Sequence, residues 1–395
     1  KFNNCLTVIV FFIDKHLRAL EENAGKREPF KRSSLYAQLQ EQIAEVSGFE
    51  GKDPALSARK VINQFVKIGF INPLLLGYHP LVRKFINAKS EEEKDIIFSK
   101  IFYERSSLAS DVTVDQRELK HIHFFLKTLD HNGSLSRDDV MALMVTDITR
   151  YPAGFLTREQ LDSQYRYAKI CEFDERKYNQ IDHLKGYLKH VVDLKYDRYE
   201  ERFWFADDPQ IVERDFEKSY ARDGVKHRIY KEELKEDSRL LYGAFVSYLD
   251  KKPYKSLIAS HIKPLVDCLR EGREDQAYDA ENGLLLDPTV DSYFDKKDIS
   301  FDDEGNILFG KAVAPEIRAD LEKFSLDARI LTEKRREYLR YHRRLFNEKN
   351  GAGQPGVREQ AADESGQAGY TYIDLFWGAG GLSLGFDRAG FRNIL

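Results

Sequence analysis

Ala259-Ser260-His261-Ile262-Lys263-Pro264 is followed, about twenty residues later, by Glu281-Asn282-Gly283-Leu284-Leu285-Leu286. Two more blocks come next in the chain, Asp287-Pro288-Thr289-Val290-Asp291-Ser292-Tyr293-Phe294-Asp295 and Ile299-Ser300-Phe301-Asp302. These blocks contain a histidine, an asparagine and several aspartates, and histidine can act as a base while carboxylates can bind a divalent cation. Such residues suit hydrolysis by a water molecule that a base and a metal ion activate.

The order of the blocks resembles the HNH nucleases of the restriction-enzyme group. The resemblance runs from Ile258 to Phe346, and its last block is Tyr338-Leu339-Arg340-Tyr341-His342-Arg343. It implies a ββα-metal module that hydrolyses phosphodiester bonds of double-stranded DNA. By resemblance, His261 is the general base and Asn282 holds its ring in the useful tautomer.

The same resemblance implies a metal site on the helix after the hairpin. Asp291 and Asp295 are four residues apart there and therefore share one helix face. Mg²⁺, or a similar divalent ion, is the expected ligand of such oxygen atoms. Two positions depart from the family pattern: Thr289 stands where a histidine or asparagine is common, and Leu265 replaces a frequent tryptophan. Either reduced activity or a shift of the metal onto Asp291 would follow.

A run of basic residues ends the HNH-like region. We expect it to contact DNA phosphates, which positions DNA without reading its sequence. The alternative is a solvated helix face, because Glu333 and Glu337 interrupt the positive charge. The expected DNA-binding residues are Lys334, Arg335, Arg336, Arg340, Arg343 and Arg344.

The end of the chain carries a second motif, Tyr370-Thr371-Tyr372-Ile373-Asp374-Leu375-Phe376-Trp377-Gly378-Ala379-Gly380-Gly381-Leu382-Ser383. A short apolar strand, a glycine-rich turn and a helix are expected, as in a Rossmann-like sheet that binds a nucleotide-like cofactor. The motif resembles the first motif of DNA cytosine-5 methyltransferases. By resemblance, S-adenosylmethionine would lie among Phe376, Gly378, Ala379, Gly380, Gly381 and Leu382.

The catalytic Pro-Cys dipeptide of that family has no counterpart in this sequence. Methylation at carbon 5 needs a thiolate that attacks a flipped cytosine. None of Cys5, Cys171 and Cys268 follows a proline. We therefore expect the chain itself to be inactive as a methyltransferase, and to be a truncated product or a piece of a longer fusion.

Residues 1–240 form a mainly helical region that we expect to recognise DNA. Apolar residues at Leu35, Leu39, Ile43 and Val46, and again from Val61 to Ile68, recur at helical spacing. Two such helices before Gly69 favour a winged-helix or helix-turn-helix unit that would enter a major groove, with a plain helical hairpin as the alternative. Residues 241–346 form the nuclease module, 347–369 a linker rich in Gly, Gln, Ala and Glu, and 370–395 the methyltransferase start.

Composition sets few further bounds on function. The formal net charge is −4, so DNA binding would depend on a local basic face. Three cysteines without a CxxC pair argue against a disulfide framework or a cysteine zinc site, and fit a reduced cytoplasm. The longest apolar run, Leu6 to Ile13, is too short to span a membrane.

The sequence thus predicts a multidomain, mostly α protein that belongs to a restriction–modification system. The leading hypothesis is an active HNH endonuclease fused to the start of a cytosine-5 methyltransferase. The second is a methyltransferase fragment whose HNH module has decayed, and the third is a winged-helix DNA-binding protein without catalysis. Cutting both DNA strands with one HNH site would favour a homodimer.

Overall fold

The computed structural model describes residues 2–22, 33–49, 53–107, 119–173, 184–197, 200–206, 223–351, 371–372 and 392–393. The chain divides into two units, residues 1–350 and 351–395. In the second unit, β8 (Thr371–Tyr372) pairs in parallel with β9 (Arg392–Asn393). β8 lies where a strand is expected. The rest of the methyltransferase segment, with its cofactor residues from Phe376 to Leu382, and most of the linker lie outside the described residues.

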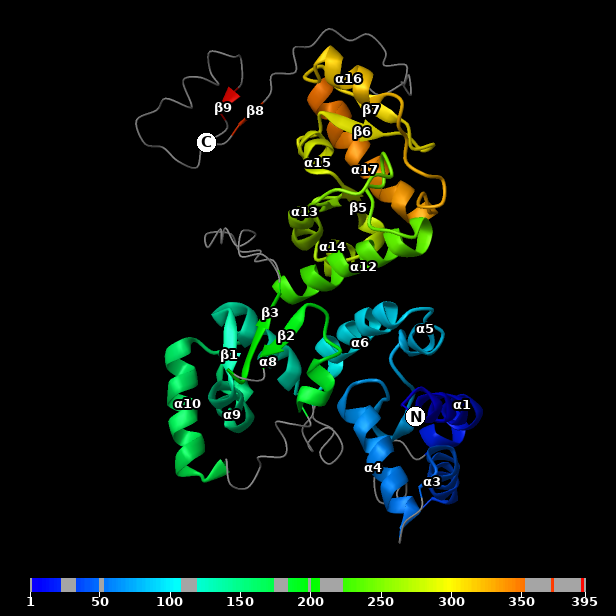
Figure 1. Cartoon of the computed structure of the whole chain (residues 1–395), viewed down its shortest axis with the longest axis vertical. Helices are drawn as coiled ribbons and strands as arrows, with labels where there is room; N and C mark the ends of the chain where they lie inside the picture. Colours follow the sequence, from blue (N-terminus) through cyan, green and yellow to red (C-terminus); the bar gives the residue numbers. More distant parts are fainter. Residues whose placement is uncertain are drawn as a thin grey trace. The chain divides into compact units, whose positions relative to one another are not determined.

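The first part of the larger unit is mostly helical (Figure 1). Its helices are α1 (Phe2–Glu21), α3 (Ser34–Ser47), α4 (Pro54–Lys67), α5 (Val82–Ile86), α6 (Glu91–Arg105), α8 (His121–Asn132), α9 (Arg137–Val145) and α10 (Arg158–Ile170), with 3-10 turns η1 (Pro73–Leu75) and η2 (Ile148–Arg150). An antiparallel sheet has the order β1 (Ser134–Ser136), β3 (Arg202–Phe205), β2 (Leu194–Asp197).

Polar residues fix where several of these helices begin. Ser33 accepts a hydrogen bond from the backbone N–H of Tyr36, and Asp53 accepts one from Leu56, each satisfying a free donor of the first turn. Ser136 starts α9 with a reciprocal capping box. The residues next to each helix N-terminus therefore determine where these helices begin.

The expected apolar stripe of α4 is confirmed, because Ile62, Phe65 and Val66 are buried. The stripe of α3 is confirmed at Leu39 and Ile43 but wrong at Val46, which is 40% exposed. After α4 the chain makes an isolated antiparallel bridge between Ile71 and Tyr78. Apart from this bridge, residues 53–107 contain no strands that could form the wing of a winged helix. The winged-helix or helix-turn-helix unit therefore stays a prediction.

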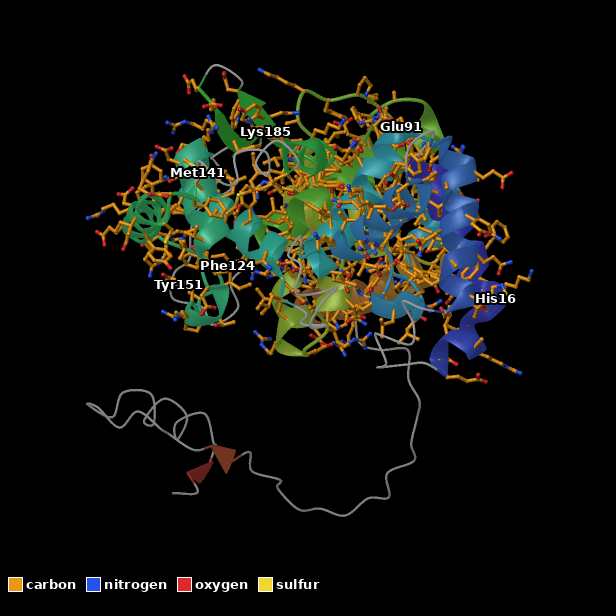
Figure 2. The ribbon with its side chains drawn as sticks, turned by 90° about the horizontal axis from the view of Figure 1, so that it is seen from below. His16, Glu91, Phe124, Met141, Tyr151 and Lys185 are labelled. Atoms are coloured by element: carbon orange, nitrogen blue, oxygen red, sulfur yellow. The ribbon has the colours of Figure 1, made fainter. Side chains whose placement is uncertain are left out.

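One continuous hydrophobic cluster holds the helical part together. It extends from α1 through α8 to the small sheet, where Phe125 meets Phe203 edge to face at 6.2 Å between ring centroids. Phe124 of α8, also buried in this cluster, lies against Tyr151, with ring centroids 6.1 Å apart; both are labelled in Figure 2. No helix among the described residues is both long and apolar enough to cross a membrane.

The second part of the larger unit combines short strands with helices. Its elements are α12 (Gly224–Tyr242), β4 (Ile258–His261), α13 (Leu265–Arg270), α14 (Glu274–Ala277), η4 (Ala280–Asn282), β5 (Gly283–Leu286), α15 (Pro288–Asp295), β6 (Ile299–Phe301), β7 (Ile307–Phe309), α16 (Pro315–Leu321) and α17 (Glu333–Asn350). β4 pairs with β5, and β6 with β7, both antiparallel. Figure 1 shows α13, α15 and α17 gathered near β5.

Helix α12 belongs to both hydrophobic clusters of the larger unit. Val225 and Ile229 are buried in the first cluster, whereas Tyr230 and Leu234 are buried in the second. Ion pairing between Lys100 of α6 and Glu233 of α12 also ties the helix to the N-terminal part. The predicted boundary between residues 240 and 241 therefore falls in the last turn of a helix that already contributes to the second core.

Candidate functional site

The β4–β5 hairpin and α15 form a ββα unit. His261 ends β4 and pairs with Gly283, the first residue of β5. Asp287 then caps α15, because its carboxylate accepts hydrogen bonds from the backbone N–H groups of Thr289 (3.0 Å) and Val290 (3.2 Å). The helix contacts β4. Two antiparallel strands and a helix that contacts one of them therefore lie together at these residues.

His261 is half-buried at the end of β4. Its Nε2 lies 3.0 Å from the carbonyl oxygen of Ala277. A carbonyl oxygen only accepts hydrogen bonds, so Nε2 carries a proton, and in the neutral form of the ring the lone pair is on Nδ1. A ring held in this tautomer can take a proton from water at Nδ1.

Asn282 is fully buried, and its contacts correct the expected role. Its Oδ1 accepts a hydrogen bond from the N–H of Lys263 (2.7 Å), and its Nδ2 donates to the carbonyls of Lys263 and Gln276, both at 3.0 Å. The amide therefore does not bond to the His261 ring. It fixes the connection between β4 and β5 by binding the backbone of Lys263 and Gln276. Gln276 precedes Ala277, whose carbonyl binds the His261 ring, so Asn282 positions His261 through the backbone.

Asp291 lies on α15 beside β4. Ser260, the residue before His261, is the neighbour whose hydroxyl lowers the pKa of this carboxylate. Burial raises the pKa of Asp291 above its ordinary value; the Ser260 hydroxyl lowers it, and the negative charges of Asp295 and Asp287 raise it. A carboxylate that is desolvated and next to other carboxylates gains most from a bound cation.

The carboxylate oxygens of α15 fit a metal ion that needs few ligands from the protein. No group of three or more His, Cys, Asp or Glu residues within the described part of the chain is placed to hold a metal. Mg²⁺ keeps several waters and binds through one or two carboxylates plus phosphate oxygens, and Asp291 can supply one of these. The second expected ligand, Asp295, has a side chain that is 78% exposed. Sequence reasoning did not assign Ser260, although it stands next to the histidine.

Arg335 does not face solvent, which corrects its expected contact with DNA. Its side chain is 4% exposed. The guanidinium donates to the carbonyls of Ile330 (2.5 Å) and Ala280 (3.0 Å) and lies 3.6 Å from Glu281. Arg335 therefore joins the start of α17 to the turn before β5. The basic run gave no sign of this, because burial of one arginine depends on how α17 packs.

The other basic residues of α17 have partners within the chain. Lys334 pairs with Asp279 (2.6 Å), Arg340 with Glu333 (2.9 Å), Arg343 with Asp303 (2.5 Å) and Arg344 with Glu348 (3.8 Å), while Arg336 donates to the carbonyl of Asp303 (3.0 Å). The side chains of Lys334, Arg340 and Arg344 are 45–59% exposed, whereas Arg343 is 18% exposed. Phosphate contacts from this helix stay a prediction, and they would have to compete with the acidic partners.

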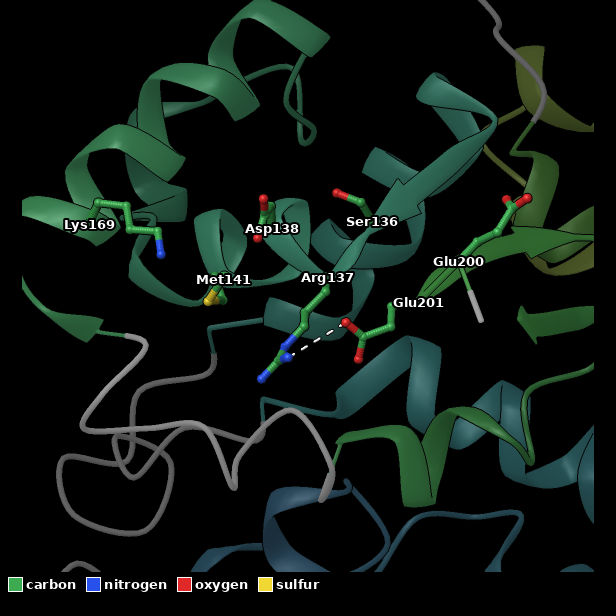
Figure 3. Close-up of a pocket in the computed structure, with 7 residues that line it drawn as sticks. All are labelled: Ser136, Arg137, Asp138, Met141, Lys169, Glu200 and Glu201. Carbon is green, nitrogen blue, oxygen red and sulfur yellow. Dashed lines mark ion pairs between the residues drawn. The ribbon is translucent and has the colours of Figure 1, made fainter. Parts of the chain in front are cut away.

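Two hollows lie in the N-terminal part, away from the ββα unit. Figure 3 shows one of about 380 Å³, lined by Ser136, Arg137, Asp138, Met141, Lys169, Glu200 and Glu201. Arg137 and Glu201 form an ion pair across it at 3.6 Å. The other, of about 620 Å³, lies between α4, α8 and α9 and includes Lys60, Phe125 and Met144. Neither hollow presents the combination of base and carboxylate seen at the ββα unit.

The sequence model of a family described as HNH endonuclease matches residues 244–302, which contain β4, β5 and α15. The chain therefore carries an HNH endonuclease domain in this range. The match includes neither α12 nor α17.

A curated protein resembles the chain over a short stretch. The type II methyltransferase M1.HphI of Haemophilus parahaemolyticus is 80% identical to it over 25 residues. This stretch is 6% of the chain and 7% of that protein, so the chain spans only a small fraction of the relative's length.

Proposed function

We propose that the domain containing residues 244–302 is a metal-dependent endonuclease that hydrolyses double-stranded DNA. One observation carries the proposal: within the family match, His261 ends β4 with Nε2 bound to the Ala277 carbonyl, and Asp291 lies on α15, the helix that contacts β4. A candidate base and a candidate oxygen ligand therefore come from two elements that contact each other. This is the pair of groups that phosphodiester hydrolysis requires.

Each of these residues has a separate role in the proposed hydrolysis. Nδ1 of His261 takes a proton from water while the water oxygen bonds to phosphorus, and the departing oxygen takes a proton from solvent. The Ala277 carbonyl stabilises the imidazolium that forms, because Nε2–H donates to it. Asn282 keeps that carbonyl in place. A divalent ion on Asp291, with Asp295 as its second ligand, would neutralise charge on the phosphate.

Cleavage of unmethylated plasmid DNA tests this function. Purified protein with Mg²⁺ is expected to give nicked and linear products, and chelation of the metal should abolish them. His261→Ala should remove cleavage, whereas His16→Ala on α1, in the N-terminal part, should cut like the wild type. Absence of cutting with Mg²⁺ and with Mn²⁺ would contradict the proposal and favour a decayed module.

The short likeness to a type II methyltransferase supports a second proposal, that the nuclease belongs to a restriction–modification fusion. Residues 370–395 would then begin a cytosine-5 methyltransferase that binds S-adenosylmethionine through Phe376 to Leu382. The test is transfer of labelled methyl groups to DNA by protein from the complete reading frame. Transfer that is lost on Gly380→Asp supports the fusion, and lack of transfer opposes it.

The alternative is a winged-helix DNA-binding protein without catalysis. It would be favoured if the protein binds DNA without metal and without His261, and does not cut it. Gel-shift assays with the wild type and His261→Ala in the presence of a chelator separate this outcome from the nuclease. The same assays, combined with sedimentation, would show whether the protein binds as a homodimer.

A further inference from the structure

An aromatic ring from α12 lies flat against the proposed general base. The rings of Tyr230 and His261 have centroids 4.6 Å apart and an interplanar angle of 14°. Tyr230 is fully buried. It lies on α12, before the first residue of the family match, so the HNH pattern itself does not include it.

The hairpin backbone holds the Tyr230 ring in place. Its hydroxyl donates to the carbonyl of Ser260 at 3.3 Å and lies 3.5 Å from the carbonyl of Asn282. A Cβ at Gly283 would overlap Oη of Tyr230 and lie 2.7 Å from Cδ1 of Leu234. The absence of a side chain at Gly283 thus lets α12 approach the strand pair closely enough for the stack to form.

His227, one turn before Tyr230, completes the ring cluster. Its centroid is 5.8 Å from that of Tyr230 and 6.1 Å from that of His261. Lys226, the residue before His227 on α12, pairs with Glu274 at 2.9 Å. The face of His261 is therefore covered by α12, while its Nε2 edge is anchored on Ala277.

We propose that Tyr230 is a positioning residue for His261, and this rests on the proposed nuclease function. The hydrogen bond to Ala277 fixes one edge of the imidazole, and the stacked phenol fixes the plane of the ring. Together they leave Nδ1 pointing in one direction, which general-base catalysis requires. The electron-rich phenol face also stabilises the ring once it has taken the proton.

Three variants separate this role from simple packing. Tyr230→Leu removes the ring, Tyr230→Phe keeps it, and Tyr248→Leu removes another fully buried tyrosine of the same cluster. Tyr248 makes a suitable control because its hydroxyl donates to the carbonyl of Leu234, and its nearest ring partner is Tyr242. Cleavage is measured under single turnover over a range of DNA concentrations with Mg²⁺.

We expect Tyr230→Leu to lower the maximal cleavage rate about tenfold, with the DNA concentration for half-maximal rate unchanged. Tyr230→Phe should restore the rate to within about threefold of the wild type, because it keeps the stack. Tyr248→Leu should lower thermal stability without this loss of rate. Equal loss of rate in Tyr230→Leu and Tyr248→Leu would overturn the proposal, as would an effect on half-saturation alone.

A second measurement does not depend on cleavage. Protein labelled with ¹⁵N and ¹³C in histidine is examined by NMR, and the His261 signals are assigned by their absence in His261→Ala. The wild type should show the tautomer protonated at Nε2 and a ring-current shift from Tyr230. Tyr230→Leu should lose the shift, and Tyr248→Leu should keep it. Unchanged His261 signals in Tyr230→Leu would refute the positioning role, even if the protein cut no DNA.

Discussion

Replacement of Asn282 by alanine would remove a buried clamp that joins the two strands of the site. The wild-type amide satisfies three backbone groups: the N–H of Lys263 at 2.7 Å and the carbonyls of Lys263 and Gln276 at 3.0 Å. Each group left without a partner in a buried site costs about 1–3 kcal/mol. Because local relaxation recovers part of this, we expect Asn282→Ala to lower the opening free energy of the hairpin by about 3–6 kcal/mol.

Hydrogen exchange followed by mass spectrometry measures this opening directly. Peptides that cover β4 and β5 should exchange much faster in the variant, whereas peptides from α3 and α4 should not change. Asn306→Ala is the matched control, since its exposed amide bonds only to the neighbouring Asp302 at 2.9 Å. A loss below about 1 kcal/mol in Asn282→Ala would refute the view that this amide holds the connection.

The other predictions concern stability at low pH, the packing of buried residues, and the roles of charged residues in binding DNA and Mg²⁺. Burial lowers the pKa of His342 to about 4, so the unfolded chain takes up a proton first as pH falls from about 6.5 towards 4, and stability is lost in that window. Thermal melts from pH 7 to 4.5 should show a fall to which His342 contributes up to about 3 kcal/mol, and His342→Gln should make the fall smaller by that amount. Arg335→Ala should lower the melting temperature, while Arg344→Ala should leave it unchanged and weaken DNA binding only at low salt in a filter-binding assay. Gly283→Ala should destabilise the domain by about 1–3 kcal/mol in the same melts, because Tyr230 blocks the added methyl group. Asp291→Asn should raise the Mg²⁺ concentration for half-maximal cleavage several-fold, and an unchanged metal dependence would remove Asp291 from the ligand set.

The sequence predicted the parts of the site that depend on neighbouring residues. The resemblance implied a helix that carries Asp291 and Asp295, and α15 is that helix, capped by Asp287 before Pro288. Gly283 to Leu286 is an apolar run that forms the buried strand β5. The resemblance implied a strand pair with His261, and the structure pairs His261 with Gly283 although α13, α14 and η4 separate the two strands.

Contacts between distant elements could not be predicted in this way. Asn282 was expected to hold the His261 ring, but its amide bonds to the backbone of residues 263 and 276 instead. Arg335 was expected in solvent, but α17 packs so that its guanidinium meets the carbonyl of Ala280. Tyr230 comes about thirty residues before the histidine, and only the approach of α12 to β5 brings their rings together. The spacing of residues along the sequence does not determine how α12 and α17, which lie outside the family match, pack against the hairpin.

The central claim is that Nδ1 of His261 takes the proton from water, and chemical rescue tests it most directly. His261→Gly leaves a space against Tyr230 in which free imidazole can replace the lost ring. We expect the variant to be inactive with Mg²⁺ alone, and we expect imidazole to restore plasmid cleavage in proportion to its neutral form. Imidazole should not restore cleavage by Asp291→Asn at low Mg²⁺. Full cleavage by His261→Gly without imidazole, or no rescue in a variant whose hairpin exchange is unchanged, would contradict the role of His261 as the base.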